Sequence, residues 1–328
     1  MKIRHAPTLL LLVLAAALLA LGATGCGRDE DEGDGGVAAS TTGEQLSGNV
    51  LIDGSSTVGP LTTSAAESYR NEQPNVNIEV GVSGTGGGFE RFCAGETDIS
   101  NASRPIDEEE EVPLCQDAGV EYTEFQVGVD ALTIVVNTAN DWVDCLTVDQ
   151  LNTIWEPKAE GKVTNWNQVD PSFPDQELSL AGPGTDSGTF DYFTDEINGE
   201  EGASRTDYQA SEDDNQTVQA VSGAEGGLGY FGFTYFEENE DSLKALEVDG
   251  GEGCVAPSVE TARDGSYAPL SRPLFIYVKN ESLQKPEVRG FVEYFLTNSI
   301  QLAEDALFIP VPDEQVYENL STLESAGA

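Results

Sequence analysis

The chain has 328 residues, of which 59 are Asp or Glu and only 15 are Lys or Arg, so its formal net charge is −44. This balance excludes nucleic acid as a partner, because proteins hold its phosphates with Lys and Arg side chains. Acidic runs such as Asp107-Glu-Glu-Glu-Glu111 are spread along the chain rather than confined to a tail. We therefore expect an acidic surface suited to a salty habitat, where salt screens the repulsion between carboxylates.

The first residues have the pattern of a secretory signal. Met1-Lys-Ile-Arg-His5 is basic, and the apolar run from Leu9 to Leu21 is too short to span a bilayer comfortably. The segment Ala23-Thr-Gly-Cys26 resembles a lipobox, although that motif most often has Leu in place of Ala23. We predict a lipoprotein signal peptide over residues 1–25 and a lipid anchor on Cys26. An ordinary signal peptide with a different cleavage site is the alternative.

Residues 26–47 are acidic and then small and polar, with little to bury, which predicts a disordered tether. The remaining part of about 280 residues suits two domains better than one.

Apolar runs with β propensity alternate with helical patterns after the tether, which is typical of α/β layers. The runs at 131–136 and 273–278 are apolar enough to be strands buried on both faces, and they are natural places for the chain to cross between two lobes. The predicted strands are 50–52, 76–80, 98–100, 126–137, 178–180, 227–231 and 273–278. The predicted helices are 57–71, 87–93, 148–155, 188–197, 213–222 and 286–296, with closing helices near Ile300 and Val316.

The cysteines indicate two disulfides, because four remain after Cys26 in an exported protein. Three pairings are open. We favour Cys93–Cys115 and Cys145–Cys254, since both members of each pair then lie in one domain. No CxxC spacing is present, so no metal site is predicted.

The only histidine is His5, inside the predicted signal peptide. The mature chain therefore lacks the commonest general base and metal ligand.

Three segments rich in Gly, Ser and Thr each close a predicted strand and open a predicted helix. They are Asp53-Gly-Ser-Ser-Thr-Val58, Ser83-Gly-Thr-Gly-Gly-Gly88 and Gly182-Pro-Gly-Thr-Asp-Ser-Gly-Thr189. The first turn of a helix offers unpaired N–H groups and the positive end of the helix dipole, which suit an oxyanion. Any one segment alone is also typical of a simple cap or turn. The three together, two in the first block of the chain and one in the second, predict an anion site between two lobes.

Arg104 follows a predicted strand end beside Ser103, where its planar fork could bind an anion. A surface ion pair with the acidic run 107–111 is the alternative, and Arg205 is a second candidate cation. Enzyme chemistry fits less well. The segment at 83–88 lacks the Lys of a nucleotide-binding loop, and Ser187 has no histidine to activate it.

Four ordered motifs resemble those of the periplasmic phosphate-binding proteins of Pst-type ABC transporters. The motifs are Gly54-Ser-Ser-Thr-Val58, Ser83-Gly-Thr-Gly-Gly-Gly-Phe89, Asp98-Ile-Ser-Asn-Ala-Ser-Arg-Pro-Ile106 and Gly182-Pro-Gly-Thr-Asp-Ser-Gly-Thr-Phe-Asp-Tyr-Phe193. The match continues to Val278 and covers nearly all of the chain from about residue 48.

The resemblance implies an α/β, two-lobed periplasmic-binding-protein fold of type II, in which two crossover strands form a hinge. We place lobe 1 at residues 48–133 plus 272–328 and lobe 2 at residues 134–271.

The resemblance also implies how the three turns bind phosphate. This chain departs from the best-studied family pattern, which has Arg where Pro183 stands and Asp where Ser103 stands. Arg104 could replace the lost charge, and Asp53 or Asp186 could accept the proton that phosphate carries and sulfate lacks. The predicted ligand-binding residues are Ser56, Thr57, Val58, Thr85, Gly86, Ser103, Arg104, Asp186, Ser187, Gly188 and Thr189.

The function that this resemblance implies is capture of inorganic phosphate by an exported, lipid-anchored protein that faces the periplasm or the cell exterior. The protein is expected to be a monomer that delivers phosphate to an ABC permease by closing its cleft, with no chemistry, metal or cofactor. A binder of another oxyanion, such as sulfate or molybdate, is the main alternative. A phosphatase that uses the same cleft is a weaker one.

Overall fold

The computed structural model describes residues 45–326. The predicted signal peptide, the anchor residue Cys26 and residues 26–44 of the predicted tether lie outside this range. No helix within residues 45–326 is both long and apolar enough to cross a membrane.

Strands and helices alternate along much of the chain, as the sequence predicts, although β9, β10 and β11 follow one another and three helices close the chain. In chain order the strands are β1 (Ser47–Gly54), β2 (Asn75–Val80), β3 (Ile99–Ala102), β4 (Tyr122–Asn137), β5 (Cys145–Thr147), β6 (Ser179–Gly182), β7 (Gln209–Ala210), β8 (Gly227–Gly232), β9 (Leu243–Ala245), β10 (Glu247–Asp249), β11 (Cys254–Val255) and β12 (Ser271–Lys279).

The helices cover both faces of the sheets. In chain order they are α1 (Val58–Glu72), α2 (Gly84–Cys93), α3 (Glu111–Ala118), α4 (Val148–Trp155), α5 (Gly188–Asn198), α6 (Asp214–Gly223), α7 (Phe233–Glu237), α8 (Val259–Arg263), α9 (Pro286–Thr297), α10 (Ser299–Asp305) and α11 (Asp313–Ser325). Short 3₁₀ turns occupy Pro157–Ala159, Trp166–Gln168 and Ser282–Gln284.

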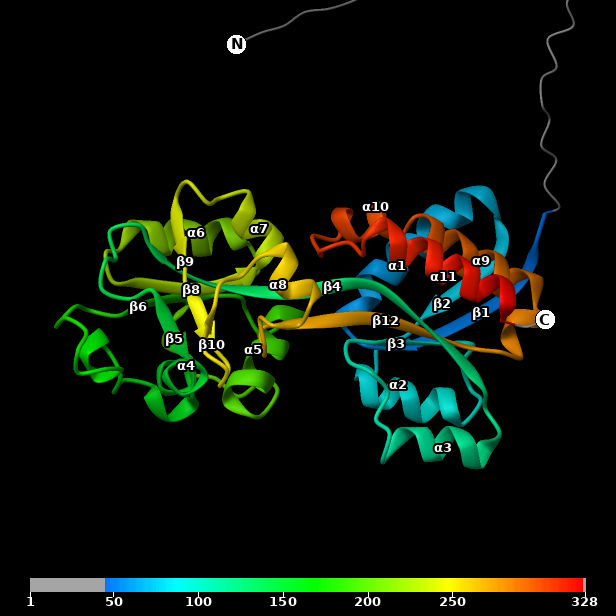
Figure 1. The fold of residues 1–328 in the computed structure, drawn as a ribbon, viewed down its shortest axis with the longest axis horizontal. Helices are drawn as coiled ribbons and strands as arrows, with labels where there is room; N and C mark the ends of the chain where they lie inside the picture. Colours follow the sequence, from blue (N-terminus) through cyan, green and yellow to red (C-terminus); the bar gives the residue numbers. More distant parts are fainter. Residues whose placement is uncertain (1–44, 327–328) are drawn as a thin grey trace, which may run out of the picture. The chain divides into compact units, whose positions relative to one another are not determined.

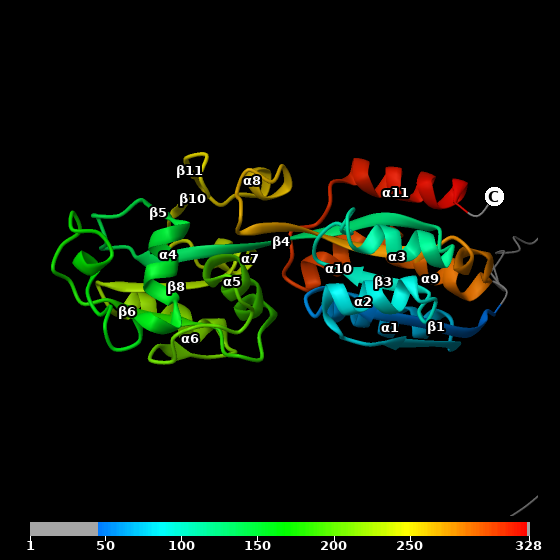
Figure 2. The ribbon, with the colours of Figure 1, turned by 90° about the horizontal axis from the view of Figure 1, so that it is seen from below.

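One sheet runs through both lobes in the order β2-β1-β3-β12-β4-β8-β6-β7, and β9 also pairs with β4. Strands β4 and β12 are the two crossovers, and they lie side by side as antiparallel neighbours from one lobe to the other (Figures 1 and 2). Every residue of β4 from Val127 to Asn137 is buried, which agrees with the apolar run in the sequence. A separate sheet of β11, β10 and β5 lies in lobe 2.

In lobe 1, successive side chains of β12 point to opposite faces of the sheet, and each set joins a different core. Leu274, Ile276 and Val278 pack with α1 and α9, whereas Phe275 and Tyr277 pack with α2 and α3. Figure 1 shows these two helix layers on either side of the sheet.

The second lobe has its own cores. Buried residues of β4 beyond Ala131 pack there with α4, α5 and β8, around Trp155 and Tyr230. The fold class is therefore confirmed as α/β with two lobes and two crossover strands, while the exact lobe boundaries given above stay a prediction.

Both favoured disulfides are present. Cys93 and Cys115 join α2 to α3 with an S–S distance of 1.97 Å, and Cys145 and Cys254 join β5 to β11 with an S–S distance of 2.03 Å. Each bond lies within one lobe, as the pairing argument requires.

Candidate functional site

A cleft of about 780 Å³ opens between lobe 1 and α5 of lobe 2, beside the start of β12. All three Gly/Ser/Thr turns reach it, so the structure brings together segments that are far apart in the sequence. The predicted site residues that line the cleft are Ser56, Thr57, Thr85, Gly86, Ser103, Arg104 and Gly188.

The first turn follows β1 and begins α1. The backbone at Gly54 has φ +138°, and a Cβ there would lie 2.1 Å from the carbonyl oxygen of Asn101, so only glycine fits. The Ser55 Oγ accepts from the N–H groups of Thr57 (3.2 Å) and Val58 (3.4 Å), which fixes the turn. Thr57 is buried and lines the cleft.

The second turn packs directly on the first because both contain glycine. A Cβ on Gly88 would lie 2.5 Å from the Cα of Gly54. The Thr85 Oγ1 accepts from the Ser103 N–H at 3.2 Å and lies 3.1 Å from the Ser103 Oγ. Within residues 45–326 the Ser83 side chain makes no capping hydrogen bond to α2. It therefore does not compete with a ligand for the first backbone N–H groups of this helix.

The third turn faces the first across the cleft. A Cβ on Gly188 would lie 3.6 Å from the Thr57 Oγ1. The Ser187 Oγ caps α5 by accepting from the Thr189 N–H at 3.2 Å. The amino terminus of α5 therefore meets the amino terminus of α1, and both helix dipoles present their positive ends to the same region.

The cation at the centre of this cleft is Arg272, at the start of β12. Its Nη2 donates to the Thr57 Oγ1 at 2.7 Å, and its Nη1 lies 3.5 Å from the Ser103 Oγ. The guanidinium also pairs with Asp130 on β4, at 3.1 Å from Nη2 and 3.2 Å from Nε. It stacks on the Tyr192 ring of α5, 3.5 Å from the ring centroid.

Sequence reasoning missed Arg272, although a signal was available. Arg272 and Asp130 stand at the ends of the two apolar crossover runs and lie directly opposite each other in the antiparallel register. A charged side chain beside a buried strand needs a partner of opposite charge. Arg272 at one run and Asp130 at the other meet this need for each other.

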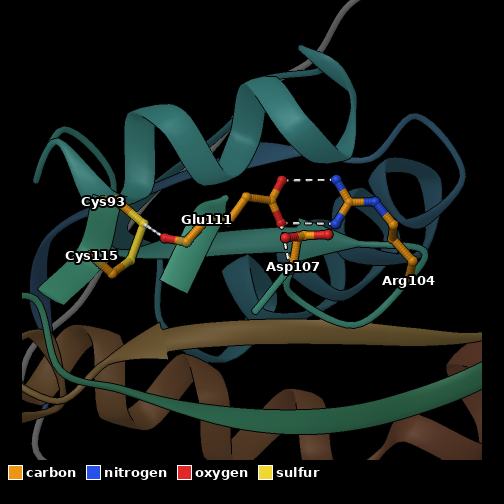
Figure 3. Close-up of a disulfide and its surroundings, with 5 residues drawn as sticks. All are labelled: Cys93, Arg104, Asp107, Glu111 and Cys115. Carbon is orange, nitrogen blue, oxygen red and sulfur yellow. Dashed lines mark hydrogen bonds and ion pairs between the residues drawn. A yellow bond between two sulfur atoms is a disulfide. The ribbon is translucent and has the colours of Figure 1, made fainter. Parts of the chain in front are cut away.

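Arg104 lines the outer part of the cleft but is engaged by its own lobe. Its Nη1 and Nη2 each donate to a Glu111 carboxylate oxygen at 2.8 Å, as Figure 3 shows. Glu111 begins α3, the helix that the Cys93–Cys115 disulfide ties to α2 (Figure 3). The Glu111 carboxylate raises the pKa of the Arg104 guanidinium, which therefore stays charged on the cleft wall.

Comparison with known proteins agrees with this geometry. A family model described as a PBP superfamily domain matches residues 39–299. The chain is 47% identical over 303 residues to "Protein SphX" of Synechocystis sp., covering 92% of this chain and 85% of the relative. It is 40% identical over 310 residues to "Phosphate-binding protein PstS" of Staphylococcus saprophyticus, covering 94% of this chain and 91% of the relative. A crystal structure titled as a possible phosphate binding protein from Planctomyces limnophilus has TM-score 0.82 and 43% identity, covering 86% of this chain and 99% of that one.

The chain belongs to the Pst-type phosphate-binding proteins.

Four predicted ligand residues of this Pst-type protein are not among the residues that line the cleft: Val58, Asp186, Ser187 and Thr189. Their direct contact with an anion stays a prediction.

Arg205, the other candidate cation, and Asp53, one of the two candidate proton acceptors, bind other groups in the structure. Arg205 is 4% exposed and binds Asp207 and the carbonyl oxygens of Ile154 and Val163 within lobe 2. Asp53 is buried, pairs with Arg91 of α2, and accepts from its neighbour's N–H.

The lobe 2 side of the cleft is acidic. Asp191, Asp195, Glu196 and Glu201 line it, and all four lie on or just after α5. Burial raises the pKa of Asp191, and the nearby Glu201 raises it further. Burial also raises the pKa of Glu196. The hydrogen-bond donors that could bind an anion in the cleft therefore come from lobe 1, from Arg272 on β12 and from the amino terminus of α5.

Within residues 45–326 the one group of three close Cys, Asp or Glu side chains is Cys145, Glu247 and Cys254, and its two cysteines form a disulfide.

We predict that Arg272 and Asp130 are energetically coupled. Arg272→Met should lower the free energy of unfolding by about 3 kcal/mol, because it leaves the buried Asp130 carboxyl unpaired. Asp130→Asn should cost less, since Arg272 borders the open cleft and retains Thr57. The double variant should cost less than the sum of the two single changes, as measured by urea unfolding. Additive costs would show that the pair is not coupled.

Proposed function

We propose that this protein binds inorganic phosphate in the cleft between its lobes and delivers it to an ABC importer without altering it. The observation that carries the proposal is that the Arg272 guanidinium donates to the Thr57 and Ser103 hydroxyls, while the Thr85 hydroxyl lies beside that of Ser103. Hydroxyls, helix termini and an arginine fork are the groups that bind a small tetrahedral oxyanion. The phosphate-binding relatives support the same ligand.

Short-range hydrogen bonds carry the binding in this proposal. Arg272 is paired with Asp130 and Arg104 with Glu111, so neither adds much net positive charge to the cleft. Closure of the lobes replaces the water around the anion with fixed donors. Micromolar affinity requires about 8 kcal/mol net, which several charge-assisted hydrogen bonds can provide after the costs of closure.

Two other functions remain as alternatives. Another oxyanion, such as sulfate or molybdate, would use the same donors. A phosphatase would need a base to activate Ser187, and the sole histidine of the chain is His5. The family membership also favours binding over catalysis, because the Staphylococcus relative and the Planctomyces structure are named as phosphate-binding proteins.

Calorimetric titration of ligand-stripped protein should show tight phosphate binding and weaker sulfate binding. Arg272→Lys should weaken phosphate binding by about 10- to 100-fold, because Lys keeps the charge but loses the planar fork. Arg104→Lys should have a smaller effect, since Arg104 already binds Glu111. Wild-type affinity in Arg272→Lys, or equal sulfate binding by the wild type, would contradict the proposal.

We infer that the Asp191 carboxylate accepts a hydrogen bond from the protonated oxygen of phosphate. Sulfate carries no such proton and cannot donate this bond. It is the cleft carboxylate nearest in sequence to Gly188, where α5 approaches Thr57. Asp191 is half-buried in the open cleft and loses water when the lobes close. An acceptor that then meets no donor costs about 1–3 kcal/mol, so sulfate should be rejected.

Asp191→Asn should lower the ratio of phosphate to sulfate affinity by about tenfold. The matched control is Asp195→Asn, one turn along the same helix, which should leave the ratio near that of the wild type. An unchanged ratio in Asp191→Asn would exclude Asp191 as the acceptor.

We also propose that the protein is exported and attached to the membrane through Cys26, and that it works as a monomer with an acidic surface adapted to salt. After cell fractionation, the wild type should be found with membranes and Cys26→Ala should be soluble. The same distribution for both would contradict a lipid anchor on Cys26.

A further inference from the structure

We propose that Tyr192 is the residue that ties closure of lobe 2 to the presence of an anion at Arg272. This inference rests on the proposed function and adds a positioning residue to it. The Tyr192 ring face contacts the guanidinium, and its hydroxyl is bound to the Pro269 carbonyl oxygen, so we assign its effect to Arg272 and not to a hydrogen bond with the anion.

The contact between Tyr192 and Arg272 is close, and both the ring and the hydroxyl of Tyr192 are held in place. Tyr192 is 3% exposed, and its ring centroid lies 3.5 Å from the Arg272 guanidinium carbon. The Tyr192 hydroxyl donates to the carbonyl oxygen of Pro269 at 2.6 Å, three residues before Arg272. The ring is thus held against the start of β12, and burial raises the pKa of the hydroxyl, which keeps it protonated as a donor.

The stack leaves the edge of the guanidinium for hydrogen bonds. A planar guanidinium donates in its own plane, while its face can lie on an aromatic ring. All polar partners of Arg272 use that edge: Asp130, Thr57 and Ser103. Tyr192 therefore fixes the plane in which Arg272 presents its donors to the cleft.

The same contact joins the two lobes. Thr57 and Ser103 belong to lobe 1, whereas Tyr192 lies on α5 in the core of lobe 2. An anion bound to the edge of the Arg272 guanidinium fixes its orientation. It thereby also fixes the face on which Tyr192 of α5 stacks when the lobes close. The other arginine of the cleft makes no such link between the lobes. The Arg104 guanidinium lies 5.7 Å from the centroid of the Phe89 ring, and both residues belong to lobe 1.

The test compares three variants. Tyr192→Leu removes the ring, and Tyr192→Phe keeps the ring but loses the bond to Pro269. The matched control is Tyr208→Leu, because Tyr208 also lies in lobe 2 and its hydroxyl donates to the Pro183 carbonyl at 2.8 Å, while its ring packs on Trp155. Each variant is titrated with phosphate by calorimetry. Small-angle X-ray scattering then measures the decrease in radius of gyration when phosphate is added, and thermal unfolding without ligand reports stability.

We expect Tyr192→Leu to weaken phosphate binding by about tenfold or more and to reduce the phosphate-induced decrease in radius of gyration. Tyr192→Phe should stay within about threefold of the wild type, and Tyr208→Leu should lose stability without losing closure.

If Tyr192→Leu binds phosphate and closes as the wild type does, the inference about Tyr192 is wrong, while the proposed function stands. Equal losses in Tyr192→Leu and Tyr208→Leu would also overturn the inference, because they would show a general effect of damage to lobe 2. If the wild type responds to neither phosphate, sulfate nor molybdate, the proposed function fails, and this inference fails with it.

Discussion

The ion pair between Arg272 and Asp130 is the interaction on which the rest of the site depends. It joins the two crossover strands at directly opposite positions, at the point where the chain passes between the lobes. Both side chains are mostly buried, so each satisfies the other where water is scarce. With Asp130 behind it, Arg272 can direct donors toward Thr57 and Ser103 without leaving an unpaired charge in the hinge.

A phosphate site in so acidic a protein follows from the same arrangement. The net charge of −44 repels anions at long range, and Asp195, Glu196 and Glu201 on and after α5 do so inside the cleft. Binding must therefore come from donors that act over hydrogen-bond distances: hydroxyls, helix amides and a paired arginine. Strong screening by salt would weaken the repulsion far more than it weakens those contacts.

Local signals in the sequence were enough for much of the fold. The three turns can be predicted because segments rich in Gly, Ser and Thr recur at three strand–helix junctions, and α4 and β8 lie almost where expected. α3 was missed, because its first residue ends the acidic run at 107–111 and Pro113 interrupts its pattern. α2 begins at Gly84, three residues earlier than predicted, because its glycines conceal a helical pattern.

Arg272 was missed for a different reason. Its partner Thr57 is 215 residues away, and no local pattern reports such a contact. Arg104 was favoured instead because it stands next to Ser103, yet its nearest acceptor is Glu111, within the same lobe.

A crystal structure of the protein with phosphate bound would test directly whether Arg272 is the cation that holds the anion. We expect one phosphate within hydrogen-bond distance of the Thr57 and Ser103 hydroxyls and of Arg272, with Arg272 still paired to Asp130 and stacked on Tyr192. A phosphate held at Arg104 instead, with Arg272 making no contact to it, would contradict the central claim.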